Sequence, residues 1–265
     1  MSIARANDGV AIAYEVRGKG PPDIVFMHGW AGSGSYFDET LAYVDLERTR
    51  AISFDFRGHG DSDTGAAYGL DELAADTIAV TDAAGAAEVV LVGFSMSGKF
   101  AQYVSARHPD RVLGQILVAG CPASELPLPA ELLADWYACA GDGERLIALA
   151  AQFITEPVAR EVLDRFGQQA ARIPLAALQG TMEAVTQTSF APASRPTLVV
   201  GGVRDPLFTP DLLRDQVAAP ISGARLELLE CGHEIPIERP RELAGLVESF
   251  ALNIGKPVPP LLDQA

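Results

Sequence analysis

Short apolar runs separated by polar segments recur along the chain and predict the strands of a sheet. They lie at 24–27, 51–56, 89–92, 116–119, 197–200 and 226–229. Apolar runs of this length suit strands that are buried on both faces. Near the N-terminus, the turn sequence Asn7-Asp8-Gly9 separates two alternating runs, which predicts an opening hairpin.

Helical periodicity fills several of the intervals between these runs. One apolar stripe extends from Leu70 to Thr81 and stops before Gly85, and another helical segment begins at Thr209-Pro210 with an N-cap residue and a proline. A third follows Pro240. Strands that alternate with helices predict an α/β fold whose central sheet is mostly parallel and covered by helices on both faces.

The alternation fails between residues 122 and 192. This segment has helical patterns at 131–140, 144–154 and 158–166, and its roughly seventy residues are too many for a simple loop. We therefore expect a helical cap (122–192) inserted into a core formed by 1–121 and 193–265. Packing between cap and core is the common role of apolar side chains at such positions; those that we expect to reach a substrate are Trp136, Tyr137, Phe153, Phe166, Leu175, Leu178 and Met182.

The segment Gly93-Phe94-Ser95-Met96-Ser97-Gly98 ends an apolar run in a serine flanked by small residues. A serine hydroxyl becomes an effective nucleophile only with a base to take its proton and a third group to orient that base. Asp205 and His233 each follow a later apolar run. Because sites in such sheets lie beyond the carboxyl ends of the strands, we expect Ser95, His233 and Asp205 to meet there as nucleophile, base and orienting acid.

An oxyanion hole is the second requirement of acyl transfer. The first buried run breaks at His28-Gly29-Trp30, a turn that can direct a backbone N–H toward the serine. Met96 begins the helix after Ser95, and the first N–H groups of a helix have no intrahelical partners. The backbone N–H groups of Trp30 and Met96 are therefore the predicted oxyanion hole, and the Trp30 side chain is an expected substrate contact.

These motifs, in this order, resemble the alpha/beta-hydrolase family, whose Gly-x-Ser-x-Gly elbow is followed by an acid and then a histidine. The chain departs from the pattern at Ser97, which stands in place of the second glycine and is small enough for the strained turn. Lys99, close to the elbow, is expected to extend outward along its helix. The resemblance implies a cap that roofs the site, and it implies structural roles for His28 and His59.

Within the family, the pairing of His28-Gly29-Trp30 with the elbow is similar to that of small bacterial aryl esterases and cofactor-free haloperoxidases. It implies hydrolysis of a carboxylic ester or lactone through an acyl-enzyme on Ser95, and in such relatives peroxide can replace water. The same triad serves carbon–carbon bond hydrolases and enol-lactonases of aromatic degradation, so these remain alternatives. A non-catalytic small-molecule binding protein of the same fold is another.

Composition and charge narrow the range of partners. The 265 residues are 48% hydrophobic, enough for a large core, and the net charge of −15 opposes binding to nucleic acid or to an anionic membrane. We therefore expect a small-molecule substrate. Three cysteines are too few for a disulfide framework or a zinc site, and the four histidines are scattered, so the sequence predicts no metal and no cofactor.

The two ends of the chain give two further expectations. The N-terminus lacks the charged start and the apolar segment of an export signal, which predicts a cytoplasmic protein, and no segment is typical of a membrane-spanning helix. The proline-containing segment 255–265 is expected to be a loosely attached end. Nothing in the pattern indicates an oligomeric state.

Overall fold

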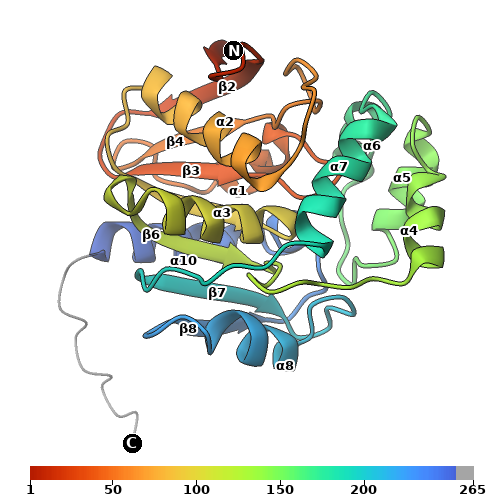
Figure 1. Cartoon of the computed structure of the whole chain (residues 1–265). Coiled ribbons are helices and arrows are strands. Elements are labelled where there is room, and N and C mark those ends of the chain that lie inside the picture. Colours follow the sequence, from red (N-terminus) through yellow and green to blue (C-terminus); the bar gives the residue numbers. More distant parts are fainter. Residues whose placement is uncertain (255–265) are drawn as a thin grey trace, which may run out of the picture.

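An eight-stranded sheet forms the centre of the computed structural model, which describes residues 1–254 (Figure 1). The strand order is β1-β2-β4-β3-β5-β6-β7-β8; β1 and β2 are antiparallel to their neighbours, and β3 to β8 are parallel. The predicted mostly parallel sheet and the opening hairpin are confirmed; the expected loose tail at 255–265 lies outside the described residues. The strands are β1 (Ser2–Arg5), β2 (Ala11–Gly18), β3 (Asp23–Met27), β4 (Arg50–Phe54), β5 (Val89–Phe94), β6 (Val112–Val118), β7 (Thr197–Gly202) and β8 (Arg225–Leu229).

Both faces of the sheet are buried over β3 to β7, as the apolar runs predict, whereas β8 at the edge of the sheet is mostly exposed, so the burial predicted for 226–229 was wrong. In β3, Val25 and Met27 belong to one core cluster, whereas Ile24 and Phe26 belong to the other, because successive side chains of a strand point to opposite faces. The first face is covered by α2 (Leu70–Ala83), α3 (Met96–Arg107), α8 (Pro210–Leu212) and the π-helical η3 (Leu213–Ala218). The second is covered by η1 (Gly34–Phe37), α1 (Asp38–Leu41), α9 (Ile235–Glu238) and α10 (Pro240–Asn253), and η2 (Pro109–Arg111) precedes β6.

Four helices lie in the chain between β6 and β7, and Figure 1 shows them grouped beyond one end of the strands instead of on a face. They are α4 (Ala130–Tyr137), α5 (Gly143–Ala150), α6 (Arg160–Ala170) and α7 (Leu175–Thr186). The first three correspond to the predicted helical patterns with shifted ends. The fourth was not predicted as a helix, because its residues are apolar or small around most of the circumference and form no single stripe.

Lys99 is fully buried, so the expectation that it extends outward was wrong. Its Nζ donates hydrogen bonds to the backbone oxygens of Ser124, Val185 and Thr188, at 2.9, 2.7 and 2.5 Å. These oxygens lie at the two ends of the segment that carries α4 to α7. Three carbonyls can replace the water that an ammonium group loses on burial, which is why a charged side chain is accommodated here.

None of the helices within residues 1–254 combines the length and the apolar character that crossing a membrane requires.

Candidate active site

Ser95 occupies a strained turn between β5 and α3. Its backbone angles are φ +53° and ψ −115°, in a region that L-residues rarely adopt. Close packing on both sides allows no side chains: a Cβ on Gly93 would lie 2.4 Å from the backbone oxygen of Ser97, and one on Gly98 would lie 2.4 Å from the Cα of Gly120. The glycines at 93 and 98 therefore permit the turn that projects the Ser95 side chain from the sheet.

Ser97, the departure from the family pattern, is part of this turn. Its Oγ donates to the backbone oxygen of Met27 at 2.6 Å and accepts the N–H of Phe94 at 2.9 Å. Ser97 is fully buried, and its hydroxyl ties the elbow to the end of β3. A small residue with a hydrogen-bonding side chain is thus compatible with the elbow.

A continuous chain of hydrogen bonds links the three side chains predicted from the sequence. His233 Nε2 lies 2.9 Å from Ser95 Oγ, and His233 Nδ1 lies 2.8 Å from Asp205 Oδ2. The other carboxylate oxygen of Asp205 accepts the backbone N–H groups of Leu207 and Phe208 at 2.8 and 3.0 Å. The three residues follow β5, β7 and β8, so the parallel strands deliver them to the same edge of the sheet.

Burial and charge act in opposite directions on this pair. Burial lowers the pKa of His233, but the neighbouring Asp205 carboxylate and its hydrogen bond outweigh that effect, and the pKa is raised above its usual value. Burial raises the pKa of Asp205, but His233 and the N–H groups of Phe208 and Leu207 lower it by more than burial raises it. The carboxyl group therefore titrates below its usual range. At neutral pH, Asp205 is therefore ionised and stabilises a proton on His233.

Glu238, which sequence reasoning missed, holds the histidine loop in place. Its Oε2 accepts hydrogen bonds from the backbone N–H groups of Thr155, Glu156 and Gly232, and its Oε1 accepts that of Glu234. These donors come from both sides of the site, since 155 and 156 precede α6. An acidic residue on the first helical turn after the histidine is the sequence signal that could have indicated it.

Two backbone N–H groups stand where the sequence places the oxyanion hole. Met96 is the first residue of α3, and Trp30 lies in the turn after β3, next to Ala31 with a φ of +58°. Outside helices and strands, no backbone hydrogen bond among residues 1–254 uses either N–H. The indole N–H of Trp30 donates to the backbone oxygen of Leu178 at 3.0 Å, which fixes the ring over the site.

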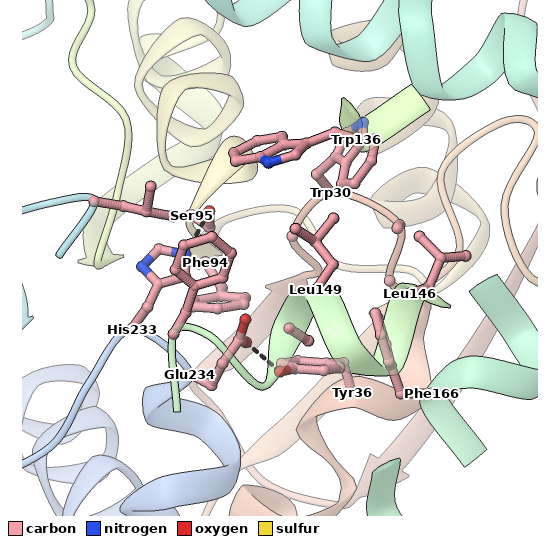
Figure 2. A pocket seen from close by; sticks show the side chains of 16 residues that line it. Trp30, Tyr36, Phe94, Ser95, Trp136, Leu146, Leu149, Phe166, His233 and Glu234 are labelled. Atoms are coloured by element: carbon pink, nitrogen blue, oxygen red, sulfur yellow. Dashed lines mark hydrogen bonds between the residues drawn. The ribbon is translucent and has the colours of Figure 1, made fainter. Parts of the chain in front are cut away.

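An aromatic and aliphatic cavity opens above Ser95 (Figure 2). The space between its walls, including the part open to solvent, is about 570 Å³. Four predicted contacts, Trp30, Trp136, Phe153 and Phe166, line it. The residues that line it without having been predicted as contacts are Gly29, Ala31, Gly32, Tyr36, Phe94, Leu146, Leu149, Ala150, Leu207 and Glu234, beside Ser95 and His233.

Four other predicted contacts lie outside the cavity wall. Leu178 and Met182 are buried and Leu175 is exposed, but none of them lines the cavity. The Tyr137 ring lies 6.4 Å from that of Trp30 and is not among the lining residues either. Helical spacing identifies apolar positions but not which side of a helix faces a cavity, which explains this difference.

His28 and His59 are buried beneath the site and contact each other, with ring centroids 5.1 Å apart. His28 Nε2 accepts the N–H of Phe56 at 3.1 Å, and its Nδ1 lies 2.8 Å from the oxygen of Gly29. Burial lowers the pKa of His28 to about 4; burial and the charge of His28 lower that of His59 to about 3. Both rings are therefore neutral and brace the ends of β3 and β4, as expected.

No group of three or more His, Cys, Asp or Glu side chains within residues 1–254 is arranged to hold a metal ion.

Comparison with known proteins places this geometry in a family. The model of the alpha/beta hydrolase family matches residues 24–246. The chain belongs to the alpha/beta hydrolase family. The strand order and the serine elbow described above are those of an alpha/beta hydrolase, and the sequence resemblance is thereby confirmed at the level of fold and family.

Individual relatives of this alpha/beta hydrolase include a non-heme haloperoxidase of Rhodococcus erythropolis, 37% identical over 124 residues, which are 46% of this chain and 45% of that protein. The chain spans just under half the length of the first curated relatives it matches. Lipase LipV of Mycobacterium tuberculosis is 27% identical over 250 residues, 87% of this chain and 93% of that protein. An esterase from Exiguobacterium antarcticum has a TM-score of 0.84 at 21% identity, covering 95% of this chain and 99% of that one, a likeness of fold.

Proposed function

We propose that this alpha/beta hydrolase cleaves a carboxylic ester or lactone of a small organic substrate through an acyl-enzyme on Ser95. The observation that carries the proposal is the hydrogen-bonded series Asp205, His233 and Ser95 beside an apolar cavity. A serine hydroxyl, an imidazole and a carboxylate in this arrangement form a recurring device for acyl transfer.

The proposed mechanism follows from the hydrogen bonds. His233 Nε2 takes the proton of Ser95 as Oγ bonds to the substrate carbonyl carbon, and Asp205 stabilises the resulting imidazolium. The N–H groups of Trp30 and Met96 stabilise the negative oxygen of the tetrahedral intermediate. His233 then gives its proton to the departing alcohol oxygen. Water, deprotonated by His233, attacks the acyl-enzyme and releases the carboxylic acid and free Ser95.

Residues 122–192 act in this proposal as a cap on a core of 1–121 and 193–265. Trp136, Leu146, Leu149, Phe153 and Phe166 come from this segment and form much of the cavity wall. A dry cavity strengthens the electrostatic stabilisation of the intermediate and limits the substrate to groups that fit among apolar side chains. The cap therefore determines which ester or lactone is accepted.

Carbon–carbon bond hydrolysis and enol-lactone hydrolysis in aromatic degradation are less well supported by the cavity. Substrates of those reactions, as products of ring cleavage, carry a carboxylate, and a buried anion requires a cationic partner. No lysine or arginine is among the residues that line the cavity. An uncharged carboxyl derivative suits this wall better.

Perhydrolysis is a second candidate activity, favoured by the similarity to the haloperoxidase of Rhodococcus erythropolis. In that reaction, hydrogen peroxide takes the place of water on the same Ser95 acyl-enzyme, so both activities require the same three side chains.

Ser95→Ala tests the proposal. We expect the wild-type protein to hydrolyse short 4-nitrophenyl esters and to react with a fluorophosphonate probe, and we expect the variant to lose the labelling and about 10³-fold or more of kcat/KM. Ser249→Ala, at an exposed position on α10, is the matched control and should retain both. A folded wild-type protein that the probe does not label would point to a binding protein without catalysis.

A further inference from the structure

Besides Ser95 and His233, the cavity wall contains a hydroxyl group and a carboxyl group that contact each other, those of Tyr36 and Glu234. The Tyr36 hydroxyl donates a short hydrogen bond to Glu234 Oε2. Tyr36 belongs to η1, Glu234 follows His233 directly in the chain, and both line the cavity. Figure 2 shows the pair on the side of the cavity opposite the two tryptophan rings.

Glu234 is a buried carboxyl group with no lysine or arginine partner among residues 1–254. Only 8% of the residue is exposed, and the contact with Tyr36 is the one hydrogen bond that the structure gives its carboxyl group. No lysine or arginine among the described residues forms an ion pair with it. Burial raises its pKa, and so do the carboxylates of Glu238 and Asp205, whereas the neighbouring His233 and the hydrogen bond from Tyr36 lower it; the net shift is upward. When Glu234 is ionised, its charge therefore has no lysine or arginine partner in the cavity wall, and a cation placed beside it would favour the ionised form.

Aromatic rings surround the same space. The rings of Trp30 and Trp136 have centroids 5.6 Å apart, and Tyr36 is stacked on Phe94 at 5.4 Å with an interplanar angle of 8°. Phe153 and Phe166 complete the wall. The faces of aromatic rings attract cations, and ammonium groups are bound where such rings surround them. A carboxylate among aromatic rings is complementary to a positive charge and repels a negative one.

We propose that Glu234, held in position by Tyr36, binds a positively charged ammonium group of the substrate. The inference rests on the proposed ester hydrolysis and deepens it, because it names the substrate class: esters with an ammonium group in the part that occupies the cavity. Tyr36 leaves one carboxylate oxygen of Glu234 available, so the carboxylate can face the cation while it keeps its hydrogen bond. Esters with a carboxylate at the same place are excluded by repulsion.

A pair of esters that differ only in charge tests this assignment. Choline butyrate and 3,3-dimethylbutyl butyrate have nearly the same shape, with a quaternary nitrogen in one and a carbon in the other. We expect the wild-type protein to have a kcat/KM about tenfold or more higher for the choline ester. Glu234→Gln keeps the size of the side chain and an acceptor for Tyr36, and should bring the ratio of the two values close to one.

Glu144→Gln is the matched control, because it removes the same charge from an exposed position on α5 and should leave the ratio unchanged. A ratio near one in the wild-type protein would overturn the inference, as would a high ratio that survives in Glu234→Gln. Tyr36→Phe separates binding from positioning: it should lower the ratio less than Glu234→Gln does, and an equal loss of activity on both esters would assign the pair a purely structural role.

The failure of this inference is distinct from failure of the proposed function. A protein that reacts with fluorophosphonate and cleaves both esters equally retains the hydrolase proposal and loses the ammonium site. A protein that cleaves neither ester and is not labelled, but whose Ser95→Ala variant binds choline butyrate in calorimetry and loses this binding on Glu234→Gln, retains the site and loses the hydrolase proposal.

Discussion

The immediate neighbours of three buried histidines give the rings different pKa values. His233 has a carboxylate on one ring nitrogen, and its pKa is raised, although burial alone would lower it. His28 and His59 are equally buried, but their ring nitrogens form hydrogen bonds only to backbone groups, and their pKa values fall to about 4 and about 3. The Asp205 carboxylate is therefore the reason that His233 can carry a proton, whereas His28 and His59 remain neutral.

The pH profile of ester hydrolysis reports this difference. His233 must be neutral to accept the Ser95 proton, so kcat/KM should rise with pH through the pKa of His233, with a midpoint above 6.5. Asp205→Asn removes the charge that raises the pKa; it should move the midpoint to lower pH and reduce kcat/KM by about 10³- to 10⁴-fold. Asp211→Asn, an exposed change of equal charge, is the control. A midpoint that does not move in Asp205→Asn contradicts the assignment.

At the scale of elements, the sequence located most strands and helices but misplaced several ends. The apolar run at 116–119 predicted a strand, whereas β6 begins at Val112, because the buried Gln115 extends it with side-chain partners at Ser105 and Thr197. A polar residue inside a strand interrupts the apolar pattern even when its hydrogen bonds are satisfied. The burial of Lys99 was not predicted either, because its carbonyl partners come from segments distant in the sequence.

Lys99 connects α3 to both ends of the segment that carries α4 to α7. Lys99→Met leaves one buried and two partly buried carbonyls without their donor and should lower the free energy of unfolding by about 2–4 kcal/mol. Lys19→Met, at a largely exposed side chain paired with Glu47, should change it by less than about 0.5 kcal/mol. Urea unfolding measures both. Equal stability of the two variants would show that the buried ammonium is not important for the fold.

For the whole molecule, acid stability depends on the two buried scaffolding rings. In the unfolded chain their pKa returns to about 6.5, so the unfolded state binds more protons than the folded state once the pH falls below that value. The contribution of each neutral ring is therefore fully present above pH 6.5 and is lost as the pH falls toward about 4 for His28 and about 3 for His59.

Urea unfolding at pH 7 and pH 5 tests this linkage. We expect His28→Gln and His59→Gln each to remove about 2 kcal/mol of the stability that the wild-type protein loses between these pH values. His108→Gln is the control, because that ring is partly exposed and burial, the main cause that lowers its pKa, is incomplete there. The comparison is of pH dependence, so a general destabilisation by either substitution does not affect it. An unchanged pH dependence in both variants contradicts the prediction.

The sequence by itself determined the strands, the covering helices and the positions from which Ser95, Asp205 and His233 project, because local apolar periodicity and turn residues carry that information. It did not determine which side chains of α4 to α7 face the cavity, the burial of Lys99, or the meeting of Tyr36 with Glu234. Each of these depends on contacts between residues far apart in the chain. Only the packed tertiary structure brings such residues together, because their burial and the charges around them are set only when the segments have assembled.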